Sequence, residues 1–149
     1  MGKETDVTAQ TRIERWEKGL KMASMHPLLG VGYANWGVAD QKYFNDTGEL
    51  SHNIFIECMS ELGYVGLSVF ILLIVSTVRN NLETMRISKL LQNAFLFNFA
   101  KSLNLSLLAY LVAGFFVTIL FYPYFWINIA MTVCANNAAK KLILEKGPE

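Results

Sequence analysis

The sequence predicts an all-α, multi-spanning membrane protein, with about three transmembrane helices preceded by a helical loop region outside the membrane. Hydrophobic residues make up 53% of the 149 residues and charged residues only 17%. This balance is too apolar for an average soluble domain. The apolar residues also gather in long uncharged runs, whereas residues 1–52 are mostly polar. A net charge of +1 without a basic stripe indicates no nucleic-acid partner.

Residues 1–52 form the predicted loop region, and its first part is predicted to be an amphipathic helix. Thr11 and Glu14 match the capping-box pattern of helix starts, and apolar residues recur at helical spacing around Trp16. Such a helix either lies on the membrane interface or packs on its neighbours, and periodicity does not choose between the two. Pro27 and the glycines after it in "HPLLGVG" predict a turn that ends the helix.

Three apolar runs in the membrane region, residues 53–149, predict spans at about 53–78, 103–122 and 125–139. The run at 103–122 carries no charge over 20 residues, or about 30 Å of helix, which is enough to cross a bilayer. The uncharged part of the first run is short, so its helix must begin near residue 53. The third run carries three asparagines, so it is either a weaker span or one shielded by protein.

The segment between the first two predicted spans fixes the expected topology. Residues 79–101 hold four Lys or Arg against one acid, so the positive-inside rule places them in the cytoplasm. Three spans then leave residues 1 to about 60 on the outer side of the membrane. The first fifteen residues are polar and do not form a signal peptide. Either a further membrane half precedes this segment, or the topology is inverted.

His52 lies in "SHN", directly before the helix of the first predicted span. Ser51 or Asn53 can cap that helix, which puts His52 beside its amino terminus. The positive end of the helix dipole disfavours imidazolium, so His52 is expected to be neutral and able to accept a proton near pH 7. The free amides at the same place attract anions such as a phosphate. The alternative is that His52 is simply a polar residue at the membrane interface.

Glu57 and Glu61 follow one turn apart on the same predicted helix. Carboxylates close to hydrocarbon are costly, so they either have a function or lie on a solvated face just above the lipid. Cys58 and Cys134 form neither a CxxC motif nor a disulfide framework, and we interpret both as packing residues. The sequence predicts no metal site and no cofactor.

Four short segments occur in an order that resembles a known family. They are "RIERW" at 12–16, "HPLLGVGYANW" at 26–36, "HN" at 52–53 and "GYVG" at 63–66, followed by a span and later by "FYPYFW". The ordered set is similar to the carboxyl-terminal half, including the periplasmic loop, of the O-antigen ligase and O-antigen polymerase family. No single segment is specific, and the set does not separate ligases from polymerases.

The resemblance implies a multi-pass protein of the bacterial inner membrane, with residues 1 to about 60 in the periplasm. Members of the family are GT-C-like membrane glycosyltransferases that use glycans carried on undecaprenyl diphosphate. A ligase transfers the glycan to lipid A core sugar of lipopolysaccharide, a polymerase transfers it to another glycan repeat, and related members glycosylate proteins. The ligase reaction needs no metal. Implied partners are therefore the lipid-linked donor, a sugar acceptor and membrane lipid.

The resemblance also assigns roles to particular residues. The family's functional histidine falls on His52, which would help to deprotonate the acceptor hydroxyl. Its loop arginine before a tryptophan falls on Arg12, which would pair with the diphosphate through its guanidinium fork. Arg15 is a less suitable substitute, and Asn53 and Glu57 are candidate supporting residues.

The sequence departs from the family in length. Family members have many more spans, and this sequence holds no counterpart of their amino-terminal half, which supplies further arginines and the lipid-binding cavity. The sequence therefore leaves open whether these residues catalyse transfer alone. The alternative to part of a glycosyltransferase is a non-catalytic membrane subunit, a transporter component or a degenerate fragment of the same family.

Overall fold

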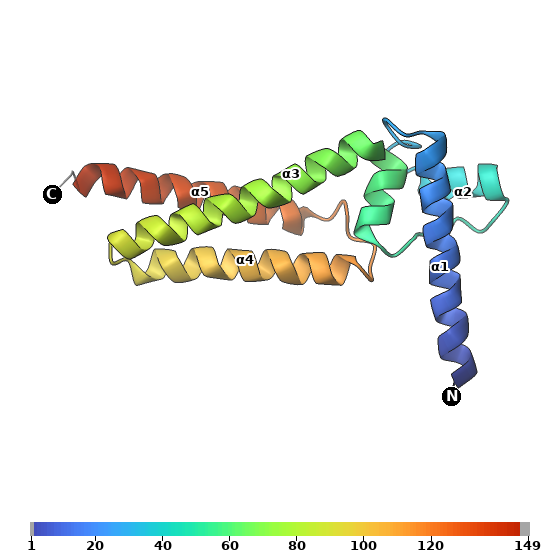
Figure 1. Ribbon diagram of the computed structural model, residues 1–149, viewed down its shortest axis with the longest axis horizontal. Helices are drawn as coiled ribbons and strands as arrows, with labels where there is room; N and C mark the ends of the chain where they lie inside the picture. Colours follow the sequence, from blue (N-terminus) through green and yellow to red (C-terminus); the bar gives the residue numbers. More distant parts are fainter. Residues whose placement is uncertain (1, 147–149) are drawn as a thin grey trace. The chain divides into compact units, whose positions relative to one another are not determined.

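A computed structural model describes residues 2–146 of the chain, with side chains described for residues 10–145. Within this range the protein is all-helical and contains no strand, as predicted (Figure 1). The helices are α1 (Gly2–Met25), α2 (Trp36–Phe44), α3 (Ile54–Leu90), α4 (Ala94–Gly114) and α5 (Pro123–Lys146). The chain divides into two compact units, one made of residues 1–71 and 112–121 and the other of residues 72–111 and 122–149.

The first unit begins with the long helix α1, which includes the residues of the predicted amphipathic helix. It starts at Gly2, so Thr11 lies inside it and the predicted capping box at Thr11 does not mark its start. The buried core of this unit is formed by Met22 of α1 with Trp36 and Ala39 of α2. The face of α1 that carries Met22 therefore packs on α2.

The helix α3 is bent where the structure departs from helical geometry at Gly63, with φ 68° and ψ −171°. The loop at residues 26–35 docks on this bend through four backbone hydrogen bonds (Figure 1). The bonds run from Val31 N to Ser60 O (2.9 Å), Gly32 N to Glu61 O (2.9 Å), Tyr64 N to Pro27 O (2.8 Å) and Val65 N to Leu28 O (3.4 Å). The segments "HPLLGVG" and "GYVG" therefore form a single joint, which we call the loop–bend joint.

Two glycines make this close approach possible. Gly30 and Gly63 both have φ +68°, a conformation that side chains disfavour. A Cβ on Gly30 would overlap the backbone carbonyl of Glu61, and a Cβ on Gly63 would overlap that of Leu28. Each glycine thus leaves the space that the opposing backbone occupies.

The second unit contains the later part of α3, most of α4 and α5. Buried amide side chains link these helices: Asn81 donates to Asn104 Oδ1 (2.9 Å), and Asn128 donates to the carbonyl of Leu103 (3.0 Å). Asn136 donates to the carboxylate of Glu83 (3.0 Å). Asn128 and Asn136 are two of the three asparagines that weakened the third predicted span, and both are buried in the protein.

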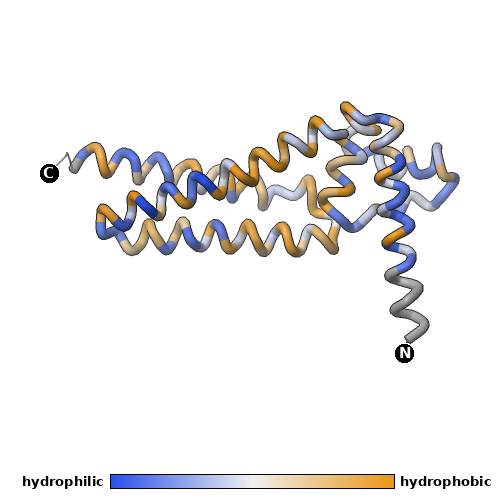
Figure 2. The backbone as a smooth tube through the Cα atoms, viewed as in Figure 1, coloured by the Kyte–Doolittle hydropathy of each residue, from blue (hydrophilic) through white to orange (hydrophobic). Residues whose placement is uncertain are grey.

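The apolar runs correspond to helices with shifted boundaries. Among the described helices, α3 and α4 are long and apolar enough to cross a membrane, and α5 does not meet that measure. Figure 2 shows α4 as mainly hydrophobic along its length. The second run was expected to be helical at 103–122, but α4 ends at Gly114 and residues 115–122 are not helical. The expected charged loop at 79–101 is mostly helical and is broken only between α3 and α4. These features indicate a membrane protein.

Candidate functional site

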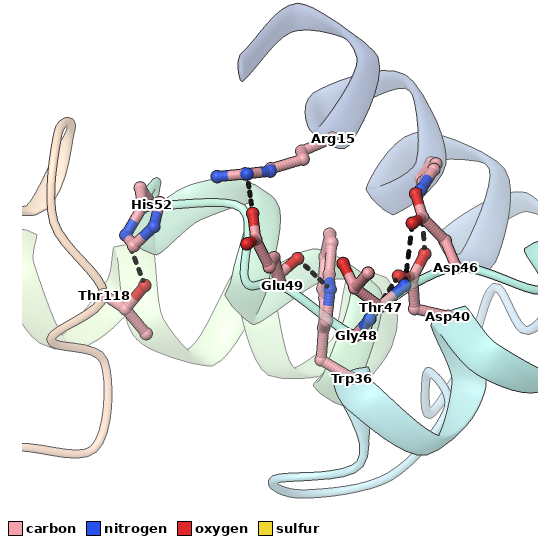
Figure 3. Close-up of polar contacts among 10 residues, drawn as sticks. Arg15, Trp36, Asp40, Asp46, Thr47, Gly48, Glu49, His52 and Thr118 are labelled. Atoms are coloured by element: carbon pink, nitrogen blue, oxygen red, sulfur yellow. Dashed lines mark hydrogen bonds and ion pairs between the residues drawn. The ribbon is translucent and has the colours of Figure 1, made fainter. Parts of the chain in front are cut away.

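The predicted base, His52, lies in the short segment between α2 and α3. Its backbone is left-handed, with φ +50°, which is uncommon for a residue with a side chain. The imidazole is half-buried, and its Nδ1 lies 3.2 Å from Thr118 Oγ1 in the same unit (Figure 3). This contact leaves Nε2 as the ring nitrogen without a hydrogen bond among the described residues.

Asn53 caps α3. It is one of the two residues, with Ser51, that the sequence predicted for this role. Its Oδ1 accepts the amides of Phe55 (3.0 Å) and Ile56 (3.2 Å), whereas Ser51 donates its hydroxyl to the carbonyl of Asn53 (3.2 Å). The Asn53 side chain thus occupies two of the amides that were expected to be free for an anion. A phosphate at this site would have to be bound mainly by other groups.

The arginines on α1 are the other candidate groups for an anion. Arg12 and Arg15 are both half-buried, and Arg15 forms an ion pair with Glu49 (Figure 3). Burial lowers the pKa of His52 below its usual 6.5, and the positive charges of Arg15 and then Arg12 lower it further. The structure therefore brings both arginines within electrostatic range of His52, which is kept in the neutral form near pH 7.

Glu57 and Glu61 are buried, so the alternative of a solvated face is wrong for both. The carboxylate of Glu61 accepts the backbone amides of Ala34 (2.9 Å) and Trp36 (3.0 Å). It therefore caps α2 from another helix, a structural role, since the preceding Asn35 makes no side-chain cap.

Glu57 is placed differently from Glu61. One of its oxygens accepts the backbone amide of Leu120, and the other, Oε2, has no hydrogen-bond partner among the residues that the structure describes. Cys58 is buried as expected, but Cys134 is exposed, so the packing interpretation is wrong for that cysteine.

A polar pocket of about 160 Å³ lies beside Arg15 in the first unit. It is lined by Thr11, Glu14, Arg15, Lys18, Asp40, Asp46, Thr47 and Glu49. Lys18 bridges the carboxylates of Asp40 (3.3 Å) and Asp46 across it, so the charges largely compensate one another. Sequence reasoning missed Asp40 and Asp46, because the polar segment "ADQKYFNDTGEL" gives only a turn signal.

Two tryptophans hold the backbone just before His52. Trp16 Nε1 donates to the carbonyl of Ser51, and Trp36 Nε1 donates to the carbonyl of Glu49, each at 3.0 Å. The ring of Trp16 also packs edge-on against Phe115, with 5.6 Å between ring centroids. The site thus contains a neutral imidazole, two guanidinium groups on one helix and a firmly held loop between them.

Comparison with known proteins confirms the resemblance noted in the sequence. Residues 1–71 match the model of the O-antigen ligase family. The exopolysaccharide production protein ExoQ of Rhizobium meliloti (strain 1021) is 29% identical over 92 residues, which cover 55% of this chain and 21% of ExoQ. The chain therefore spans about a fifth of the length of this curated relative. No solved structure matches the chain significantly.

Proposed function

Because residues 1–71 match the model of the O-antigen ligase family, we propose that this chain carries the acceptor-activating part of a membrane glycosyltransferase for bacterial surface polysaccharides. The observation that carries the proposal is the left-handed, half-buried His52, kept neutral by burial and by the charges of Arg15 and Arg12. A neutral imidazole at a fixed position beside cationic groups is suited to general-base catalysis with an anionic leaving group.

In the proposed reaction, the acceptor sugar hydroxyl attacks the anomeric carbon of a glycan carried on undecaprenyl diphosphate. The new glycosidic bond forms as the bond from the anomeric carbon to the diphosphate oxygen breaks. His52 Nε2 takes the hydroxyl proton, and the lipid diphosphate leaves as an anion. Arg12 pairs with this diphosphate, and Arg15 supports it, since guanidinium groups bind phosphate oxygens in a fork geometry. Asn53 supports His52 by capping α3.

The donor and acceptor remain part of the proposal. The acceptor is a lipid A core sugar if the protein is a ligase and another glycan repeat if it is a polymerase. Since the chain spans only 21% of ExoQ, we propose that an amino-terminal membrane half completes the lipid-binding cavity. We place the protein in the bacterial inner membrane, with residues 1 to about 60 in the periplasm, and propose that α3 and α4 cross the membrane.

The direct test is the His52→Ala variant in the native bacterium, with His26→Ala as the matched control. His26 is exposed and contacts Tyr43 Oη (3.0 Å), so its loss leaves the site intact. A general base contributes a factor of about 10²–10⁴ in rate, so His52→Ala should abolish visible surface-glycan assembly. Both variants should reach the membrane at wild-type levels.

The alternative is a non-catalytic membrane subunit or a degenerate relative that keeps the scaffold. It predicts that His52→Ala supports glycan assembly as well as the wild type does. Arg12→Lys adds a second discriminating test, because lysine keeps the charge but loses the two-pronged contact with a diphosphate. Under the catalytic proposal this variant loses most of its activity, and under the alternative it remains neutral.

A further inference from the structure

The backbone that leads into His52 is held at two successive points by indole groups. Trp36 of α2 donates to the carbonyl of Glu49, and Trp16 of α1 donates to the carbonyl of Ser51, both at 3.0 Å. Figure 3 shows the contact between the Trp36 ring and Glu49 as a dashed line. The two donors come from different helices, so the loop is fixed relative to both.

Both indoles are held firmly in place. Trp36 is only 1% exposed and packs with Met22 and Ala39 in the core of the unit. Trp16 packs edge-on against Phe115, which restricts rotation of its ring. A tryptophan loses few degrees of freedom on ordering, and its one donor has a fixed direction. Each N–H therefore defines where one loop carbonyl must lie.

The loop requires such restraint because His52 is left-handed. A non-glycine residue in this conformation costs about 1–3 kcal/mol and persists only where the surrounding structure over-determines it. On one side of His52, Trp16 fixes the carbonyl of the fully buried Ser51. On the other side, Asn53 is locked by its cap on α3. Without the Trp16 indole, the Ser51 carbonyl would lose this restraint, and the Asn53 cap and the contact of Thr118 with the imidazole would remain.

Trp16 lies on the same helix as Arg12 and Arg15 and bonds to the residue before His52. Arg15 directly precedes it, and Arg12 lies one helical turn before it on α1. We propose that Trp16 and Trp36 are positioning residues for the site, and that Trp16 sets the spacing between His52 and the α1 arginines through its bond to the Ser51 carbonyl. This inference rests on the proposed function for its catalytic consequence, but not for its structural content.

The test removes the indole N–H and keeps an aromatic ring at the position. Trp16→Phe removes the donor, with Trp126→Phe as the matched control because Trp126 is 56% exposed in the other unit. The full chain in detergent micelles is titrated by NMR on its two histidines, with His26 as the internal reference. We expect the pKa of His52 to rise towards 6.5 in Trp16→Phe as its loop moves from the arginines, and to stay unchanged in Trp126→Phe.

A second variant separates the hydrogen bond from the packing of the ring. Phe115→Leu weakens the edge-on contact but keeps the indole N–H, so the His52 titration should remain close to that of the wild type. If Trp16→Phe does not fold, biosynthetic replacement of the three tryptophans by benzothienylalanine removes each N–H with nearly the same ring shape. It should produce the same upward shift.

An unchanged His52 titration in both Trp16→Phe and the benzothienylalanine protein would overturn the inference. Glycan assembly gives the functional readout: under the proposed function, Trp16→Phe lowers kcat at least tenfold and leaves the KM for the acceptor nearly unchanged. If His52→Ala proves fully active while Trp16→Phe still shifts the titration, the proposed function fails and the positioning role stands. The two failures are therefore distinguishable.

Discussion

Substitution of Gly63 by alanine tests whether the loop–bend joint holds the first unit together. The new Cβ meets two separate costs. A side chain at φ 68° and ψ −171° lies in a region that is essentially restricted to glycine and costs about 1–3 kcal/mol. The Cβ would also overlap the carbonyl of Leu28 and separate the two backbones there. The adjacent bonds from Tyr64 to Pro27 and from Val65 to Leu28 contribute about 1 kcal/mol each.

Together these costs lower the free energy of unfolding by about 3–5 kcal/mol for Gly63→Ala. For a chain of this length, that corresponds to a fall in Tm of about 10 °C. The assay is thermal unfolding of the full chain in detergent micelles, followed by circular dichroism. Two alanine substitutions serve as controls: Gly32 has φ +106° but its Cβ would meet nothing closer than 3.7 Å, and Gly37 lies in α2 with ordinary contact at 3.6 Å.

The expected order of stability distinguishes strain from overlap. Gly37→Ala should be neutral or stabilising, because alanine favours a helix by about 1 kcal/mol over glycine. Gly32→Ala should lower the free energy of unfolding only by the backbone strain, and Gly63→Ala should lower it clearly more. A Tm for Gly63→Ala equal to that of Gly32→Ala would refute the reasoning, because it would mean that the loop does not dock closely on the bend.

Three further results are expected. Asn53→Ala should lower the free energy of unfolding by about 1 kcal/mol, and Asn53→Asp should not; a chemical denaturation series decides. Arg15→Ala should raise the pKa of His52, so activity, which is lost as pH falls through that pKa, should fail at a higher pH than in the wild type; an unchanged pH profile contradicts this. Glu61→Gln leaves a buried amide without an acceptor, so it should cost about 1–3 kcal/mol and speed hydrogen exchange at Trp36.

Local signals in the sequence were sufficient to place His52. The order Ser51, His52, Asn53 before an apolar run predicts a helix start, because a short polar side chain there can accept free amides. The structure places Asn53 in that role. The all-helical class and the location of the apolar helices followed from uncharged runs in the same way, since both depend on neighbours along the chain.

The remaining features depend on contacts between distant residues. Thr118 meets His52 across 66 positions of sequence, and no periodicity links them. The end of α4 at Gly114 was also not predicted, because the apolar run continues beyond it without a break. In the structure Gly114 is packed against Ile54 at the start of α3, where a Cβ would lie 3.0 Å from that side chain. The close approach of Ile54 therefore coincides with the end of the helix at a glycine, a residue common at helix ends.

Contacts between distant residues also join the separate sequence segments that resemble the O-antigen ligase family. The part of α3 before Gly63 carries His52 just ahead of one end and the loop–bend joint at the other. Glu61 near that joint caps α2, and α2 carries Trp36, whose indole returns to the carbonyl of Glu49. These contacts connect the glycine segments "HPLLGVG" and "GYVG" to the segment that carries His52. The glycines permit the close approach of the two backbones. The tryptophans bind the carbonyls just before His52, so under the proposed positioning role stability and positioning of the site depend on different residues.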